Sequence, residues 1–136
     1  MRQTVNSLAK LILPQRTGKW GDAMTMTLYH NPRCSKSRAA LELLRARDVS
    51  LRVVDYLKTP PSKNELQQLA RALGSARVMV RDNEPAYRDA GLDDRSSDAQ
   101  LLDAIAAHPI LLQRPILTRD GKAAIGRPTE ALLALL

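Results

Sequence analysis

The sequence is poor in the residues on which several common protein classes depend. Its 136 residues include no Phe, one Trp and three Tyr, so aliphatic side chains must fill the core. A single cysteine excludes an intramolecular disulfide framework, and with only two histidines no Cys/His zinc site is expected. If the cysteine takes part in redox chemistry, another molecule must supply the second thiol. A reducing, cytoplasmic compartment is the natural expectation.

Long apolar runs and dense basic runs are also missing. The segment SLAKLILP (7–14) is too short to span a membrane, and its interruption by Lys10 and the lack of a small-residue cleavage site make it a poor signal peptide. The formal net charge is +7, but four of the basic residues stand in the first 23 positions. No aromatic platform or DNA-binding motif accompanies the others. We therefore expect neither a membrane nor a nucleic-acid partner.

Residues 1–23 differ in pattern from the rest of the chain, and a second candidate start stands at Met24 or Met26. We expect residues 1–23 to form a disordered N-terminal extension and residues 24–136 to form one domain, a size that allows a single hydrophobic core.

The first half of that domain has the pattern of a parallel βαβ unit. MTLYH (26–30) predicts a short strand, residues 35–47 carry apolar side chains at helical spacing, and LRVVDYL (51–57) is rich in β-branched residues. Because such a crossover joins parallel strands, the loop after the first strand lies at that strand's carboxyl end. Ligands bind at this edge in open α/β sheets.

The second half begins with a largely helical block, residues 62–107. Capping boxes that start at Ser62 and Ser97 predict two helices, and Gly74 ends the first of them. A further short helical stretch is expected at 76–80.

A β-hairpin and a last helix are expected at the C-terminus. Asp120-Gly121 lies between two strand-like segments, 115–118 and 123–125, and a final helix is expected to begin near Pro128. The predicted fold is therefore α/β, with a mixed sheet and a helical insertion between the βαβ half and the C-terminal hairpin plus helix.

The loop LYHNPRCSKSR (28–38) surrounds the only cysteine, Cys34, at the predicted start of a helix. Thiolates are the reactive form of cysteine, and a helix N-terminus lowers the thiol pKa. The first amides of the helix are unpaired and face the sulfur or an incoming anion. They belong to Ser35, Lys36 and Ser37.

His30 and Arg38 each stand four residues from Cys34 and are candidates for stabilising the sulfur anion. The alternatives are a turn histidine that bonds to the backbone and a solvated helix arginine. A tyrosine-phosphatase loop is excluded because Ala40 stands where its arginine is needed, and a dithiol redox motif is excluded because Ser37 stands where its second cysteine is needed.

The stretch HNPRCSKSR (30–38) resembles the arsenate reductase family of the glutaredoxin-coupled, thioredoxin-fold type, whose mark is His-Asn-Pro-x-Cys followed shortly by Ser-Arg. The resemblance continues through separate motifs in the same order and spans about residues 26–136. These motifs are YLKTPPSKNEL (56–66), VRDNEP (80–85), HPILLQRPIL (108–117) and GRPTE (126–130).

This resemblance implies a thioredoxin-like fold and an arsenate reductase in which Cys34 attacks arsenate to form a covalent adduct. It implies that Arg81, Arg114 and Arg127 bind the oxyanion and that His30 lowers the thiol pKa. Glutathione is implied as co-substrate and glutaredoxin as partner, with no bound cofactor and no metal. The Arg114-Pro115 bond is implied to be cis.

Two other functions stay open from the sequence. The Spx-type transcription regulators share this fold and bind RNA polymerase, although typical members carry a second cysteine that this chain lacks. A thiol oxidoreductase of the same build that acts on another substrate, such as a glutathione mixed disulfide, is the other alternative.

Overall fold

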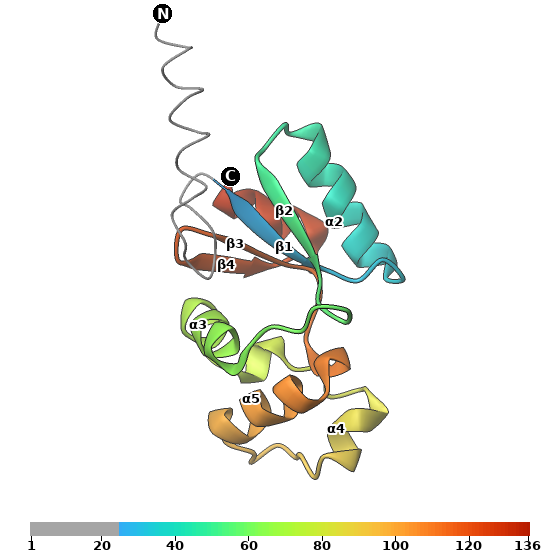
Figure 1. The fold of residues 1–136 in the computed structure, drawn as a ribbon, viewed down its shortest axis with the longest axis vertical. Helices are drawn as coiled ribbons and strands as arrows, with labels where there is room; N and C mark the ends of the chain where they lie inside the picture. Colours follow the sequence, from blue (N-terminus) through green and yellow to red (C-terminus); the bar gives the residue numbers. More distant parts are fainter. Residues whose placement is uncertain (1–24) are drawn as a thin grey trace, which may run out of the picture.

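A four-stranded mixed sheet organises the chain in the computed structural model, which describes residues 25–136 (Figure 1). Its strands are β1 (Met26–His30), β2 (Leu51–Asp55), β3 (Ile116–Arg119) and β4 (Lys122–Ile125), in the order β2-β1-β3-β4. Strand β1 pairs in parallel with β2 and antiparallel with β3, and β3 pairs antiparallel with β4. The predicted α/β fold is confirmed. The expected extension, residues 1–23, lies outside the described residues.

The predicted βαβ unit is present, with α2 (Ser35–Ala46) connecting β1 to β2. Strand β2 ends at Asp55, two residues before the predicted end. The strand stops there because the Asp55 carbonyl accepts turn hydrogen bonds from the amides of Lys58 and Thr59, at 3.0 and 2.9 Å. Tyr56 therefore lies just beyond the carboxyl end of the strand.

The two central strands, β1 and β3, are buried on both faces. Successive side chains of a strand point to opposite faces, and the core is accordingly divided into two clusters. On one face Leu28 and Leu117 pack with residues of α2 and the C-terminal helix, and on the other Tyr29 and Ile116 pack with the helical insertion. The predicted aliphatic core is thus split by the sheet.

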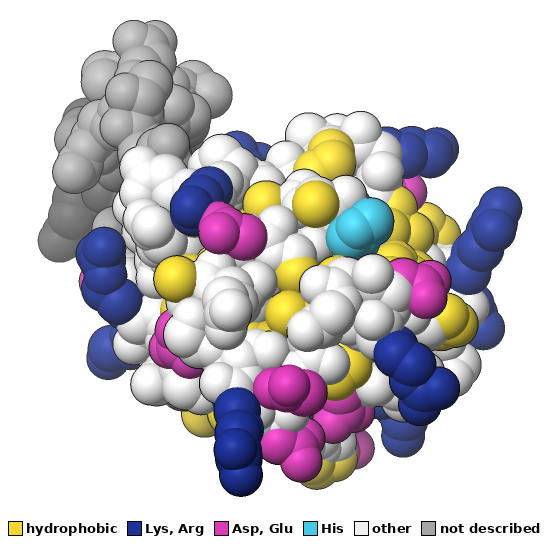
Figure 2. Space-filling view, turned by 90° about the horizontal axis from the view of Figure 1, so that it is seen from below, with side chains coloured by type: hydrophobic (Ala, Val, Ile, Leu, Met, Phe, Trp, Pro, Cys, Tyr) yellow, Lys and Arg dark blue, Asp and Glu magenta, His cyan; other side chains and the backbone are white. Residues whose placement is uncertain are grey.

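The helical insertion contains the two predicted capped helices, α3 (Lys63–Leu73) and α5 (Asp98–Ala107). Both capping boxes form, and Gly74 ends α3 with a φ of 102°, in the left-handed region that favours glycine. The insertion lies beyond one end of the sheet in Figure 1. Seen from that end, acidic and basic side chains are interspersed with apolar ones (Figure 2).

The shorter helices differ in detail from the prediction. The stretch expected at 76–80 is a single 3₁₀ turn, η2 (Arg77–Met79), and the last helix, η4 (Thr129–Leu135), is also 3₁₀. Two short elements were not predicted, α4 (Pro85–Asp89) and η3 (Pro109–Leu111). Each begins with a proline, which suits the first turn of a helix because the missing N–H has no partner there. Within residues 25–136 no helix combines the length and apolar character needed to cross a membrane.

The C-terminal hairpin brings Gly126 against Pro115. The Gly126 amide donates to the Pro115 carbonyl at 2.9 Å, and a Cβ at position 126 would stand 2.8 Å from the Pro115 ring. Only glycine fits this contact without a shift of its neighbours. The Arg114-Pro115 bond is cis, as the family resemblance implied, and the Arg127-Pro128 bond is cis as well.

Candidate active site

Cys34 is the N-cap residue of α2, as the loop sequence predicted. Its backbone is extended, with φ −99° and ψ 123°, and its carbonyl accepts the first helical hydrogen bond from the Arg38 amide at 2.9 Å. The turn before it is closed by the Cys34 amide, which donates to the Asn31 carbonyl at 3.0 Å. The thiol is partly exposed. This placement puts the sulfur over the free amides of the first helical turn.

The pKa of Cys34 lies below its ordinary value. Burial acts in the opposite direction and is the largest single effect, but several donors together outweigh it. The backbone amides of Ser37 and Lys36 donate toward the sulfur, and the Arg114 guanidinium adds both a hydrogen-bond donor and a positive charge. Because donors and cations stabilise the charged form of a thiol, the site favours thiolate.

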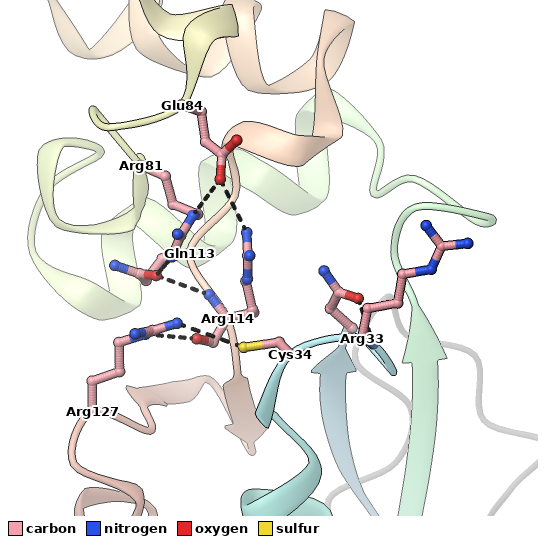
Figure 3. A network of polar contacts seen from close by, with 8 residues as sticks. Arg33, Cys34, Arg81, Glu84, Gln113, Arg114 and Arg127 are labelled. Carbon is pink, nitrogen blue, oxygen red and sulfur yellow. Dashed lines mark hydrogen bonds and ion pairs between the residues drawn. The ribbon is translucent and has the colours of Figure 1, made fainter. Parts of the chain in front are cut away.

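The amide of Ser35 is not among these main donors, and the Ser35 and Lys36 side chains are exposed. The loop therefore stabilises the thiolate mainly through its backbone N–H groups. The Arg33 side chain, next to the cysteine in sequence, points away from it (Figure 3).

His30 does not act as a cation beside the sulfur. Its ring is buried, and its Nδ1 lies 2.7 Å from the Ser37 hydroxyl oxygen, which also accepts the Asn31 amide at 3.0 Å. Burial lowers the pKa of His30, against the opposing charge of Asp55, so the imidazole is neutral at neutral pH. The Ser37 hydroxyl and the His30 ring therefore hold each other in place within the loop. The histidine holds Ser37, whose amide faces the sulfur, so the implied role of His30 in lowering the thiol pKa stays a prediction that would act through Ser37.

Arg38 likewise serves the turn. Its Nη1 donates to the Pro32 carbonyl at 2.9 Å on the exposed side of the loop. This bond anchors the Arg38 guanidinium to the backbone of the loop, and a direct role at the sulfur anion stays a prediction.

Two of the three predicted arginines reach the sulfur. The Arg127 Nη2 lies 3.8 Å from Cys34 Sγ, and its Nε donates to the Arg114 carbonyl at 2.8 Å. The Arg114 side chain comes from the segment just before the cis proline and lowers the pKa of Cys34. Residues 34, 114 and 127, far apart in the sequence, thus form one cationic site (Figure 3).

Arg81 lies on the far side of Arg114 and is held by two residues that the sequence did not single out. Its Nε donates to Glu84 Oε2 at 3.1 Å, and its Nη1 donates to Gln113 Oε1 at 2.8 Å. The same Glu84 oxygen lies 3.7 Å from Arg114 Nη1. Glu84 and Gln113 stand inside the quoted motifs VRDNEP and HPILLQRPIL, but nothing in their spacing predicts contacts across more than 25 positions.

Two hydrogen-bond donors in this cationic site have no partner among the described residues. Arg114 Nε and Nη1 are buried without a hydrogen-bond partner among residues 25–136, since the Glu84 oxygen is too distant from Nη1 to accept a good bond. Buried donors are nearly always paired in folded proteins. A planar guanidinium with free donors suits a tetrahedral oxyanion, which would lie next to the thiolate.

No cofactor site was predicted. Within the described part of the chain, no three His, Cys, Asp or Glu side chains are grouped so that they could hold a metal ion.

Comparison with known proteins agrees with this geometry. The family model described as the ArsC family matches residues 29–135. The chain is 52% identical over 112 residues to the arsenate reductase of Neisseria meningitidis serogroup A, covering 80% of this chain and 96% of that protein. It is 45% identical over 112 residues to protein YfgD of Escherichia coli K12, covering 80% and 94%.

The solved structures agree as well. The arsenate reductase of Vibrio cholerae superimposes with a TM-score of 0.78 at 43% identity, covering 85% of this chain and all of that one. The motifs, the fold and the matched length therefore agree with one another: the chain belongs to the ArsC family and has its thioredoxin-like fold.

Proposed function

We propose that this protein is an arsenate reductase in which Cys34 is the nucleophile. The observation that carries the proposal is the placement of an activated thiol, 3.8 Å from Arg127 Nη2, beside the unpaired buried donors of Arg114. Close relatives named arsenate reductase add to it.

The first chemical step is nucleophilic. Arsenate binds as an oxyanion at Arg114 and Arg127, with the amides of Lys36 and Ser37 directed at the sulfur. The Cys34 thiolate attacks arsenic, a sulfur–arsenic bond forms, and one arsenic–oxygen bond breaks as the oxygen leaves with protons as water. Arsenic is still As(V) in this adduct, so the step needs no electrons. Covalent catalysis divides a difficult reduction into simpler thiol exchanges.

The electrons come from outside the chain, because Cys34 is its only cysteine. Glutathione displaces a second oxygen from arsenic, and a glutaredoxin thiol then attacks the glutathione sulfur. The electron pair of the broken sulfur–arsenic bond passes to arsenic, which becomes As(III). A glutaredoxin–glutathione mixed disulfide forms, and hydrolysis of the remaining Cys34–arsenic bond releases arsenite. Arg81 lies behind Arg114 in this scheme and supports it through Glu84.

The test is arsenate-dependent oxidation of NADPH in the presence of glutathione, glutaredoxin and glutathione reductase. The wild-type protein should sustain the rate, and Cys34→Ser should reduce it to background while the variant keeps its thermal unfolding midpoint. A rate that survives in Cys34→Ser would contradict the proposal. A rate that needs Cys34 but not arsenate, measured on a glutathione mixed disulfide, would favour a different thiol substrate.

A further inference from the structure

Tyr56 lies next to the candidate site, although neither the sequence pattern nor the scheme above uses it. It is the first residue after β2, and Asn31 is the first residue after β1. Because β1 and β2 are parallel, their carboxyl ends meet at one edge of the sheet, the edge that carries the Cys34 loop. The Tyr56 side chain is fully buried there, with 0% of its surface exposed.

The Tyr56 hydroxyl is unpaired. The side chains of Asn31 and Arg114 lie close enough to affect its pKa, but neither makes a hydrogen bond of acceptable geometry, and no other residue of 25–136 supplies one. It shares this state with Arg114 Nε and Nη1. Leaving a buried polar group without a partner is costly, so this clustering of unpaired donors points to a ligand that accepts from them.

The other tyrosine buried beside the sheet shows that the fold can satisfy such a group. Tyr29, on β1, donates its hydroxyl proton to Glu65 Oε2 at 3.2 Å. The two tyrosines share a core cluster and have similar burial, but only the one beside Arg114 lacks a partner.

The protonation state of Tyr56 suits a donor. Burial raises the pKa of Tyr56 and outweighs the opposing positive charges of Arg114 and Arg81. The hydroxyl therefore keeps its proton at neutral pH. The nearby guanidinium groups are donors only, and Asn31 Oδ1 already accepts the Arg33 amide at 2.9 Å. The hydroxyl proton, which has no partner within the described part of the chain, is therefore available to an incoming oxygen atom.

We propose that Tyr56 is an oxyanion-binding residue of this site, whose hydroxyl donates a hydrogen bond to an oxygen of the tetrahedral anion held by Arg114 and Arg127. Only the identity of the anion as arsenate rests on the proposed function. The role of Tyr56 itself needs no more than a tetrahedral oxyanion bound beside Cys34.

The experiment measures protection of Cys34 from alkylation by iodoacetamide as arsenate, phosphate or sulfate is added. Tyr56→Phe removes only the hydroxyl and keeps the ring, and Tyr29→Phe is the matched control. We expect Tyr56→Phe to raise the half-protecting concentration of arsenate by about tenfold, the effect of one hydrogen bond to a charged group. Tyr29→Phe should keep the wild-type value. The thermal midpoint of Tyr56→Phe should be unchanged or higher, because an unpaired polar group is removed.

A wild-type concentration dependence in Tyr56→Phe would overturn the inference. A second measurement, independent of Tyr56→Phe, is the ultraviolet difference spectrum of tyrosine on addition of arsenate. We expect this spectrum in both wild type and Tyr29→Phe. Its absence from both proteins would also overturn the inference. Protection by anions without any arsenate-dependent NADPH oxidation would contradict the proposed reductase and leave the role of Tyr56 standing.

Discussion

The two halves of the candidate site are built in different ways. The Cys34 loop comes from nine consecutive residues, 30–38, and its parts hold one another through the Ser37 hydroxyl and the first amides of α2. The arginine cluster comes from three separate segments. Arg81 is held by Glu84 and Gln113 and Arg127 by the Arg114 carbonyl, whereas the Arg114 guanidinium keeps donors that are unpaired within residues 25–136. The loop stabilises the thiolate, whereas in our proposal the cluster binds the anion that the thiolate attacks.

Arg114 joins the two halves, since it both lowers the pKa of Cys34 and carries unpaired donors. We expect Arg114→Gln to lower kcat/KM for arsenate by about 100-fold, because it removes a charge and charge-assisted hydrogen bonds. The pKa of the thiol, followed by the pH dependence of its alkylation rate, should rise. This is the largest effect that we expect short of removing Cys34.

The matched control for this variant is Arg71→Gln, which removes the same charge from an exposed position on α3. It should retain both the kinetic constants and the thiol pKa. If Arg114→Gln left the thiol pKa unchanged, the coupling between loop and cluster through Arg114 would be wrong.

Gly126 tests the scaffold that brings the cluster to the loop. In Gly126→Ala the new methyl group would meet the Pro115 ring at 2.8 Å and Leu132 at 3.2 Å. We expect a loss of about 1–3 kcal/mol in the free energy of unfolding, the usual result of overpacking, measured by guanidinium denaturation. Arg127 directly follows Gly126 in the sequence, and Arg114 directly precedes Pro115. A shift at this contact should therefore also weaken the protection of Cys34 by anions.

In this variant the reactivity of Cys34 without anions is expected to change less than anion protection does, since the amides of Ser37 and Lys36 still lower the thiol pKa when Arg114 and Arg127 shift. A stable Gly126→Ala protein with wild-type anion binding would show that the close contact has no bearing on the cluster.

The smallest effect concerns the loop itself and its dependence on pH. Burial lowers the pKa of His30 below its ordinary value of 6.5. The unfolded chain therefore takes up a proton on His30 at a higher pH than the folded one does. The contribution of this histidine to stability is complete above about pH 6.5 and declines as the pH falls toward the folded-state pKa.

We therefore expect His30→Gln to flatten the decline in unfolding free energy as the pH falls from about 7 to 5. The exposed His108 offers the matched control, since His108→Gln keeps His30 and should keep the wild-type slope. An unaltered slope in His30→Gln would contradict the buried, neutral histidine.

Much of the fold could be predicted because its signals are local. Ser62 and Gly74 mark the ends of α3 through a capping box and a left-handed residue, and these features depend on only a few neighbours. The final helix was harder to predict. Its seven residues are 3₁₀ rather than α-helical, and no local pattern distinguishes the two types in so short a segment.

The candidate site shows the same difference between features that local sequence predicts and features that it does not. The sequence alone determined that Cys34 begins a helix and that its sulfur meets free amides, because an Asn-Pro turn before a helical run leaves no other start. The roles of His30 and Arg38 could not be read from spacing, since the turn directs both side chains to partners within the loop.

Only the tertiary structure decided how Arg81, Arg114 and Arg127 meet, and which residues hold them. Glu84, Gln113 and Tyr56 acquire their relation to the sulfur through the ends of separate elements, not through any repeat or motif. The physical reason is range. Helix caps and turns depend on hydrogen bonds between near neighbours in the chain, whereas an anion site depends on where the sheet brings distant side chains together.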